Sequence, residues 1–170
     1  MKKFLVVFLI FPALILAGCG SQRMTPVQKM RQAQELAQNV EKIELPDFTF
    51  YPSTVTPQFG TQIPLPVTVT AYMRVSKTTI DAQLPYLGHF YIRPLSRYDV
   101  PVRFNSKKFV YTVEYDHPTE MFNIIIAPQD VYNIMNSNMV IRLKMDKEGN
   151  GTVTIKTDNR DEIMYSGNYR

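Results

Sequence analysis

The stretch Val67-Thr68-Val69-Thr70-Ala71-Tyr72-Met73-Arg74-Val75 alternates between apolar and polar side chains along most of its length. Alternation with a period of two puts the apolar side chains on one face of an extended strand and the polar ones on the other. A turn at Ser76-Lys77 follows, and Thr79–Leu84 continues the extended pattern. The two segments therefore predict an antiparallel hairpin, which makes the domain mainly β.

Short segments of the same kind, separated by turn residues such as Asp116-His117-Pro118 and Gly149-Asn150-Gly151, fill most of the remaining chain. About ten short strands predict an antiparallel lipocalin-like barrel or a sandwich, and the barrel is favoured because closure removes exposed sheet edges. Prolines are expected to exclude regular structure from most of Pro52–Pro66, and Pro128–Ser137 to form one or two helical turns. The other expected strands are Phe48–Phe50, His89–Ile92, Val100–Phe104, Phe109–Tyr115, Met121–Ala127, Met139–Met145, Thr152–Lys156 and Glu162–Tyr165.

One helix is expected before the strands. Thr25 and Gln28 are spaced as a capping box, and Pro26 suits a first helical position. Apolar residues then recur at helical spacing, which predicts an amphipathic helix over residues 26–42. We expect its apolar stripe to pack on the β domain. Binding of the stripe to a membrane surface is the alternative.

The N-terminus has the pattern of a lipoprotein signal. Phe4–Leu16 is uncharged, almost wholly apolar and too short to span a membrane. The following Ala17-Gly18-Cys19 completes a lipobox, which predicts cleavage before Cys19 and acylation, for example with palmitate, of this single cysteine. A plain signal peptide cleaved elsewhere is the alternative. The expected organisation is a signal over 1–18, a lipidated tether over 19–25 and one β-rich domain with its helix over 26–170.

The composition bears on location and partners. After residue 18 the chain carries 17 Lys and Arg against 15 Asp and Glu, a net charge of +2 without a basic cluster, which argues against nucleic-acid binding. No Asp follows Cys19, and no acidic cluster follows it either. We therefore expect the protein to be held by its lipid in the outer membrane and to face the periplasm.

Two short motifs carry a family resemblance. Leu84-Pro85-Tyr86-Leu87-Gly88 lies near the middle of the sequence, and Arg160-Asp161-Glu162-Ile163-Met164-Tyr165-Ser166-Gly167 lies near its end. Over about residues 30–170 the chain resembles the Bacteroidetes lipoprotein family known as domain of unknown function number four-two-five-one. It departs from that family at Leu87, where an aromatic residue is common, and in a more polar hairpin at Asp146–Gly151. The resemblance implies no catalytic residue.

The motif residues have a structural interpretation. Pro85 is expected to end a strand because it has no N–H group, and Gly88 to allow a turn that a side chain would block. Tyr86 and Tyr165 are expected to be buried rings whose hydroxyl groups bond to the backbone. The motif residues with this expected role are Leu84, Pro85, Tyr86, Gly88, Arg160, Tyr165 and Gly167.

No catalytic or metal constellation stands out, and no cofactor is expected. His89 and His117 lack the partners of a triad or a zinc site. The turn with Asp146, Glu148 and Asn150 resembles a calcium loop, but its twelfth position is Thr157 rather than Glu. A polar hairpin turn explains the same residues and is favoured over a calcium site. The carboxylate pairs Asp116/Glu120 and Asp158/Asp161 fall in turns.

These observations favour a non-enzymatic binding or accessory lipoprotein. Its partner would be a small apolar ligand in a barrel mouth or a protein of the cell envelope. The alternatives are a hydrolase of envelope glycans or peptides and a purely structural envelope protein.

Overall fold

The computed structural model describes residues 25–170, and the lipobox with Cys19 lies outside this range. The chain divides into two compact units, residues 1–32 and residues 33–170, and the division falls within the helix α1 (Pro26–Glu44). Only residues 25–32 of the first unit are described. The second unit contains the rest of α1 and all the strands.

The capping box and the helix are confirmed. The backbone N–H of Thr25 donates to Gln28 Oε1 at 2.8 Å, and the N–H of Gln28 donates to Thr25 Oγ1 at 3.3 Å. The expected packing of the apolar stripe is confirmed for the last turns of the helix, where Ile43 is buried and Val40 packs against the core. No helix among residues 25–170 combines the length and the apolar character that a membrane crossing requires.

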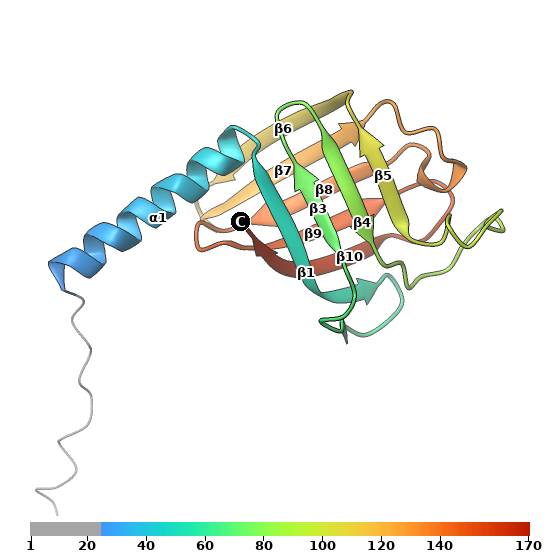
Figure 1. Ribbon diagram of the computed structural model, residues 1–170, viewed down its shortest axis with the longest axis horizontal. Helices are drawn as coiled ribbons and strands as arrows, with labels where there is room; N and C mark the ends of the chain where they lie inside the picture. Colours follow the sequence, from blue (N-terminus) through green and yellow to red (C-terminus); the bar gives the residue numbers. More distant parts are fainter. Residues whose placement is uncertain (1–24) are drawn as a thin grey trace, which may run out of the picture. The chain divides into compact units, whose positions relative to one another are not determined.

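The strands form a single antiparallel sheet of ten strands in the order β5-β4-β3-β1-β10-β9-β8-β7-β6, with β2 added beside β1 (Figure 1). The sheet curls into a nearly closed barrel, so the mainly β, barrel-like class is confirmed. The strands are β1 (Phe48–Pro57), β2 (Ile63–Pro64), β3 (Tyr72–Val75), β4 (Ile80–Leu84), β5 (Val102–Ser106), β6 (Phe109–Asp116), β7 (Met121–Pro128), β8 (Val140–Met145), β9 (Asn150–Lys156) and β10 (Ile163–Tyr169).

The two outer strands of the sheet, β5 and β6, are separated by two residues only. Asp130 fixes this corner, because its carboxylate accepts one hydrogen bond from the Ser106 hydroxyl at 2.5 Å and one from the Lys107 N–H at 2.9 Å. The first and last strands of the sheet are therefore connected by a short turn of the chain at this corner.

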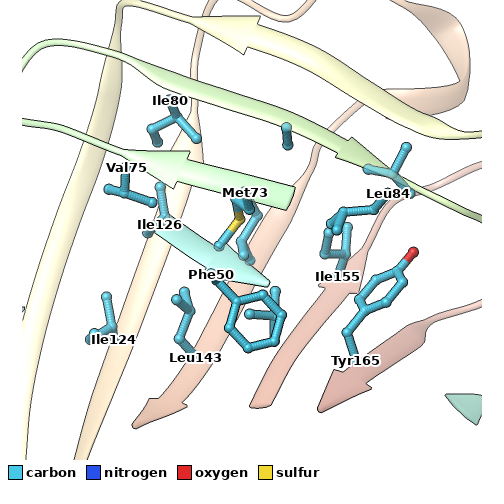
Figure 2. Packing of buried hydrophobic residues seen from close by; sticks show 14 of the residues in the cluster. Phe50, Met73, Val75, Ile80, Leu84, Ile124, Ile126, Leu143, Ile155 and Tyr165 are labelled. Atoms are coloured by element: carbon cyan, nitrogen blue, oxygen red, sulfur yellow. The ribbon is translucent and has the colours of Figure 1, made fainter. Parts of the chain in front are cut away.

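Apolar side chains from all around the barrel meet in its interior. Figure 2 shows Phe50, Met73 and Leu84 on one side facing Leu143 and Tyr165 on the other. Each of these side chains is at most 1% exposed, within one contiguous cluster of buried residues. The interior is thus packed with the protein's own side chains, as in an ordinary core.

Two expectations about the strands were wrong. The long strand Val67–Val75 is reduced to β3, because β4 ends before Pro85 and residues 67–71 have no strand opposite them. The region Pro52–Pro66 contains regular structure after all, since β1 continues to Pro57. Pro52 is tolerated there because the register with β10 shifts between Pro52 and Thr54, as at a β-bulge.

A third expected strand was also wrong, because the segment His89–Ile92 forms only an isolated bridge, from Phe90 to Arg160. A 3-10 turn at Ile134–Asn136 confirms the helical turn expected in Pro128–Ser137, and the Asn133 side chain caps it.

Candidate functional site

Three loops meet at one end of the barrel, and we call them together the loop cluster: residues 85–101, 129–139 and 157–162. They lie together on the right of Figure 1. The Asn133 side chain donates to Asp99 at 3.1 Å, which joins the first two loops, and the Asn159 side chain donates to the Ile134 carbonyl at 2.7 Å, which joins the last two. Because side chains bond the loops to one another, the cluster has a defined shape although it contains little regular structure.

The two sequence motifs meet in this cluster. The hydroxyl of Tyr86 donates to the carbonyl oxygen of His89 at 2.7 Å and lies 3.2 Å from that of Asp161. The hydroxyl of Tyr165 donates to the carbonyl of Pro85 at 2.7 Å. Both rings are buried, so the burial and backbone bonding expected for them are confirmed. Burial raises the pKa of Tyr86 to about 12 and also raises that of Tyr165.

Pro85 and Gly88 shape the first motif. Strand β4 ends at Leu84, directly before Pro85. A Cβ atom on Gly88 would lie 2.5 Å from the Tyr86 hydroxyl oxygen, which is far inside contact distance. Gly88 therefore leaves the space that the Tyr86 hydroxyl occupies.

Arg160 is a buried cation of the second motif. Its side chain is 2% exposed, its Cζ lies 4.9 Å from the Tyr86 ring centroid, and it donates to Asn136 Oδ1 and to the Val100 carbonyl. Within residues 25–170 it has no carboxylate partner, and its Nε–H has no hydrogen-bond acceptor. Burial lowers the pKa of Arg160. The guanidinium thus connects all three loops through the cation–π contact and hydrogen bonds alone.

Asp161, the next residue, holds the exposed part of the first loop. Its buried carboxylate accepts hydrogen bonds from the His89 N–H at 3.1 Å and the His89 ring Nδ1 at 2.9 Å. The interaction with the Tyr91 hydroxyl is the largest cause that lowers the pKa of Asp161, and the bonds from His89 act in the same direction. The His89 side chain itself is 82% exposed.

This shift predicts an acid-sensitive contribution to stability. Because the folded-state pKa lies below the ordinary 3.8, the ionised Asp161 stabilises the fold above about pH 4, and the contribution is lost as the pH falls through the folded-state value. The difference in unfolding free energy between the wild type and Asp161→Asn should therefore shrink on acidification, as measured by urea unfolding. A difference in unfolding free energy that stays constant with pH would contradict this prediction.

Replacing Tyr91 with phenylalanine should raise the pKa of Asp161, as measured by NMR titration, because it removes the hydroxyl group that lowers this pKa most.

The hydrogen-bonded pair of His89 and Asp161 resembles the base and the orienting carboxylate of a catalytic triad. A carboxylate that orients an imidazole is useful for catalysis only beside a nucleophile or a bound water. Among residues 25–170, no serine, threonine or tyrosine hydroxyl is hydrogen-bonded to the His89 ring. His117 is exposed in the β6–β7 turn, where its ring stacks edge-on against Tyr115.

The carboxylates singled out by sequence are used locally. Asp116 accepts a hydrogen bond from Thr119, and Asp158 accepts one from Asn138. In the β8–β9 turn, which contains Glu148, both carboxylate oxygens of Asp146 accept hydrogen bonds from Asn150. Across the described part of the chain, no three His, Cys, Asp or Glu side chains are grouped to hold a metal ion. The geometry of a hairpin turn thus accounts for the calcium-like spacing.

Sequence reasoning missed the exposed apolar side chains of the loop cluster. The first loop exposes Leu95 by 87% and Tyr98 by 70%, and the second exposes Tyr132 by 92%. We call these residues, with Leu87, Tyr91 and Ile134, the loop surface. The sequence did contain a signal: residues 85–101 form a long segment with aromatic residues and too few turn residues for a tight hairpin. The strand expected over His89–Ile92 led us to overlook it.

The comparisons with known proteins concern family and fold. Residues 30–169 match the family described as "Domain of unknown function (DUF4251)". A crystal structure of a DUF4251 family protein from Bacteroides eggerthii DSM 20697 is similar, with a TM-score of 0.53 and 14% identity over 84% of this chain and 91% of that chain. At this identity the likeness concerns the fold alone. No curated protein matches the chain.

Proposed function

This chain belongs to the DUF4251 family, whose description assigns no activity, and we propose that it is a non-enzymatic docking module of the bacterial cell envelope. The lipid expected on Cys19 holds it in the outer membrane, where it faces the periplasm. Its loop surface binds an envelope protein whose own surface offers apolar pockets with an acidic rim.

The observation that carries the proposal is the contrast between the interior and the loops. A carrier of an apolar ligand needs an open space inside its barrel. Here a contiguous cluster of buried side chains occupies the interior (Figure 2), whereas large apolar side chains are exposed on the loop surface. Of the two kinds of partner that the sequence leaves open, the contrast favours the protein over the apolar ligand.

The loop surface has the composition of a protein interface. Tyrosine and arginine are enriched at binding interfaces, because they bury a large area while keeping a polar end. The surface contains Tyr91, Tyr98 and Tyr132, and the buried residues Tyr86 and Arg160 hold the loops beneath it. A surface held in place before binding loses less conformational entropy when it binds.

Charge defines the partner more closely. Arg93 and Arg97 are both exposed on the first loop, and neither makes an ion pair within the described residues. The nearby carboxylates of Asp99 and Asp130 accept hydrogen bonds from uncharged groups of the protein. The guanidinium groups of Arg93 and Arg97 can therefore pair with carboxylates of a partner surface.

Substitution of two exposed apolar residues of the first loop should strongly weaken docking without unfolding the barrel. In the full lipidated chain, Leu95→Ser with Tyr98→Ser is expected to reduce recovery of the partner by about tenfold or more, measured by crosslinking in cells and quantitative mass spectrometry. The matched control is Val110→Ser with Ile125→Ser, which removes two half-exposed apolar side chains from the outer faces of β6 and β7.

The chemistry of the partner has its own test. Arg93→Glu with Arg97→Glu should reduce recovery of the same partner, and added salt should weaken the wild-type complex. Equal recovery from the loop and control variants would contradict the proposal. Crosslinks to lipid alone would mean that the loops bind the membrane instead, and turnover of envelope glycans or peptides by the purified protein would mean that it is a hydrolase.

A further inference from the structure

A second surface, away from the loop cluster, has the chemistry of a ligand site. It is a depression of about 360 Å³ where β1, β9 and β10 meet the β8–β9 turn. We call this site the polar depression, because it is lined by the polar side chains of Ser53, Asp146, Asn150, Thr152, Ser166 and Asn168. Ser53 lies at the β1 irregularity, and Gly167 of β10 comes so close to the β1 backbone there that no side chain fits.

A chain of hydrogen bonds orders the side chains along this depression. Asn168 Nδ2 donates to Asn150 Oδ1 at 2.9 Å, and Asn150 Nδ2 donates to Asp146 Oδ2 at 2.9 Å. The Asn150 N–H also donates to Asp146 Oδ1 at 2.7 Å. Both amide groups are therefore oriented, and Asn168 is left with its Oδ1 as an acceptor.

Several hydrogen-bonding groups in the depression remain available. Among residues 25–170, the hydroxyl groups of Thr152 and Ser166 and the Oδ1 of Asn168 make no hydrogen bond, and the Ser53 hydroxyl uses only its proton, toward the Ser166 carbonyl. Hydroxyl groups can donate and accept, whereas the Asn168 oxygen only accepts. The depression thus offers a mixed array of donors and acceptors that are already in place.

The array is suited to a neutral ligand. The one ionisable lining side chain is Asp146, and both of its oxygens are already engaged by Asn150. No lysine or arginine lines the depression, so it lacks the cation that an anionic ligand requires. Sugar hydroxyl groups, which donate and accept at once, complement such an array.

An aromatic side chain stands beside the array. Tyr51 is 47% exposed and is the direct cross-strand partner of Asn168, and the guanidinium of Arg170 lies over its ring at 5.7 Å from the centroid. An exposed aromatic ring can cover the apolar C–H face of a sugar ring while its neighbours bond the hydroxyl groups. The volume lies near the lower limit of about 300 Å³ for ligand sites, which suits one or two sugar rings.

We propose that the polar depression binds a neutral sugar, as one or two rings of an envelope glycan. The site is separate from the loop surface, so the protein can hold a glycan and a protein partner at once. This proposal does not depend on the docking function, because the two surfaces share no residue.

Amide NMR shifts of the mature chain, with Cys19→Ser to prevent lipidation, test the site. The probes are glucose, N-acetylglucosamine, maltotriose and N,N′-diacetylchitobiose, with glucuronate and calcium chloride as charged comparisons. At least one neutral probe is expected to give saturable shifts confined to residues 150–153 and 166–168, with a Kd on the order of 1 mM. The charged probes should give none there.

A matched pair of variants completes the test. Asn168→Asp keeps the side-chain shape but adds a charge and removes the donor to Asn150, so it should weaken sugar binding about tenfold or more. Asn105→Asp makes the same change at an exposed position on β5 and should bind as the wild type does. Equal affinity of the two variants, no saturable shift with any neutral probe, or saturation by calcium alone would each overturn the proposal.

Discussion

Replacing Gly167 with alanine is expected to lower the free energy of unfolding of the barrel by about 3 kcal/mol or more. A Cβ atom there would lie 2.8 Å from Pro52 Cα and closer still to the Tyr51 carbonyl oxygen. Both are backbone atoms of β1, which pairs with β10 through the irregularity at Pro52–Thr54. Since no side-chain rotation can relieve the clash, the pairing of these two central strands must shift. Urea unfolding followed by circular dichroism measures the loss.

Gly60→Ala is the matched control. Its Cβ would meet only the Pro57 side chain, at an ordinary 3.4 Å, so the change should alter stability by less than about 0.5 kcal/mol. If Gly167→Ala unfolds at the same urea concentration as Gly60→Ala, the close approach of β1 to β10 is wrong.

Replacing Tyr86 with alanine should have the second large effect, a loss of about 3–5 kcal/mol. The ring is buried between Arg160 and Phe90, whose centroid is 4.9 Å away. Its loss leaves a cavity and removes the cation–π contact from a buried guanidinium. The hydrogen bond from its hydroxyl group to the His89 carbonyl is lost as well, so the loop cluster loses its central support.

Two companion variants separate the causes. Tyr86→Phe removes only the hydroxyl group and should cost about 1 kcal/mol, the usual contribution of one hydrogen bond. Tyr98→Ala truncates a tyrosine of the same cluster that is 70% exposed and should leave stability nearly unchanged. A Tyr86→Ala variant that is as stable as Tyr98→Ala would show that the motif does not support the loops.

The fold was predictable wherever local signals and partners agree. The Thr25 capping box and the alternating segments before and after each turn predicted the helix and most of the strands. The Val67–Val75 prediction failed because alternation describes a single strand, whereas β structure needs a partner, and β4 stops at Leu84. At Pro52 the error was the opposite one, because a strand was not expected there but β1 continues through it. The irregularity in the pairing of β1 with β10 tolerates a residue without an N–H group.

The candidate site was predictable only in part. The burial and backbone bonding of Tyr86 and Tyr165 followed from their place in the two motifs. That Asp161 lies against His89 did not, because these residues are 72 positions apart and meet only when β4 and β10 are placed in one barrel. The exposure of apolar residues such as Leu95 and Tyr98 likewise depends on tertiary packing, which a local sequence pattern does not predict.

Contact between the loop surface and a protein partner can be detected with a photocrosslinking amino acid placed at Tyr98 in living cells, and the same amino acid at Val110, on the outer wall of the barrel, is the control. We expect one discrete protein adduct from Tyr98, with an acidic segment of the partner at the crosslink, and none from Val110. Absence of a protein adduct at Tyr98, or the same adduct from both positions, would contradict this expectation.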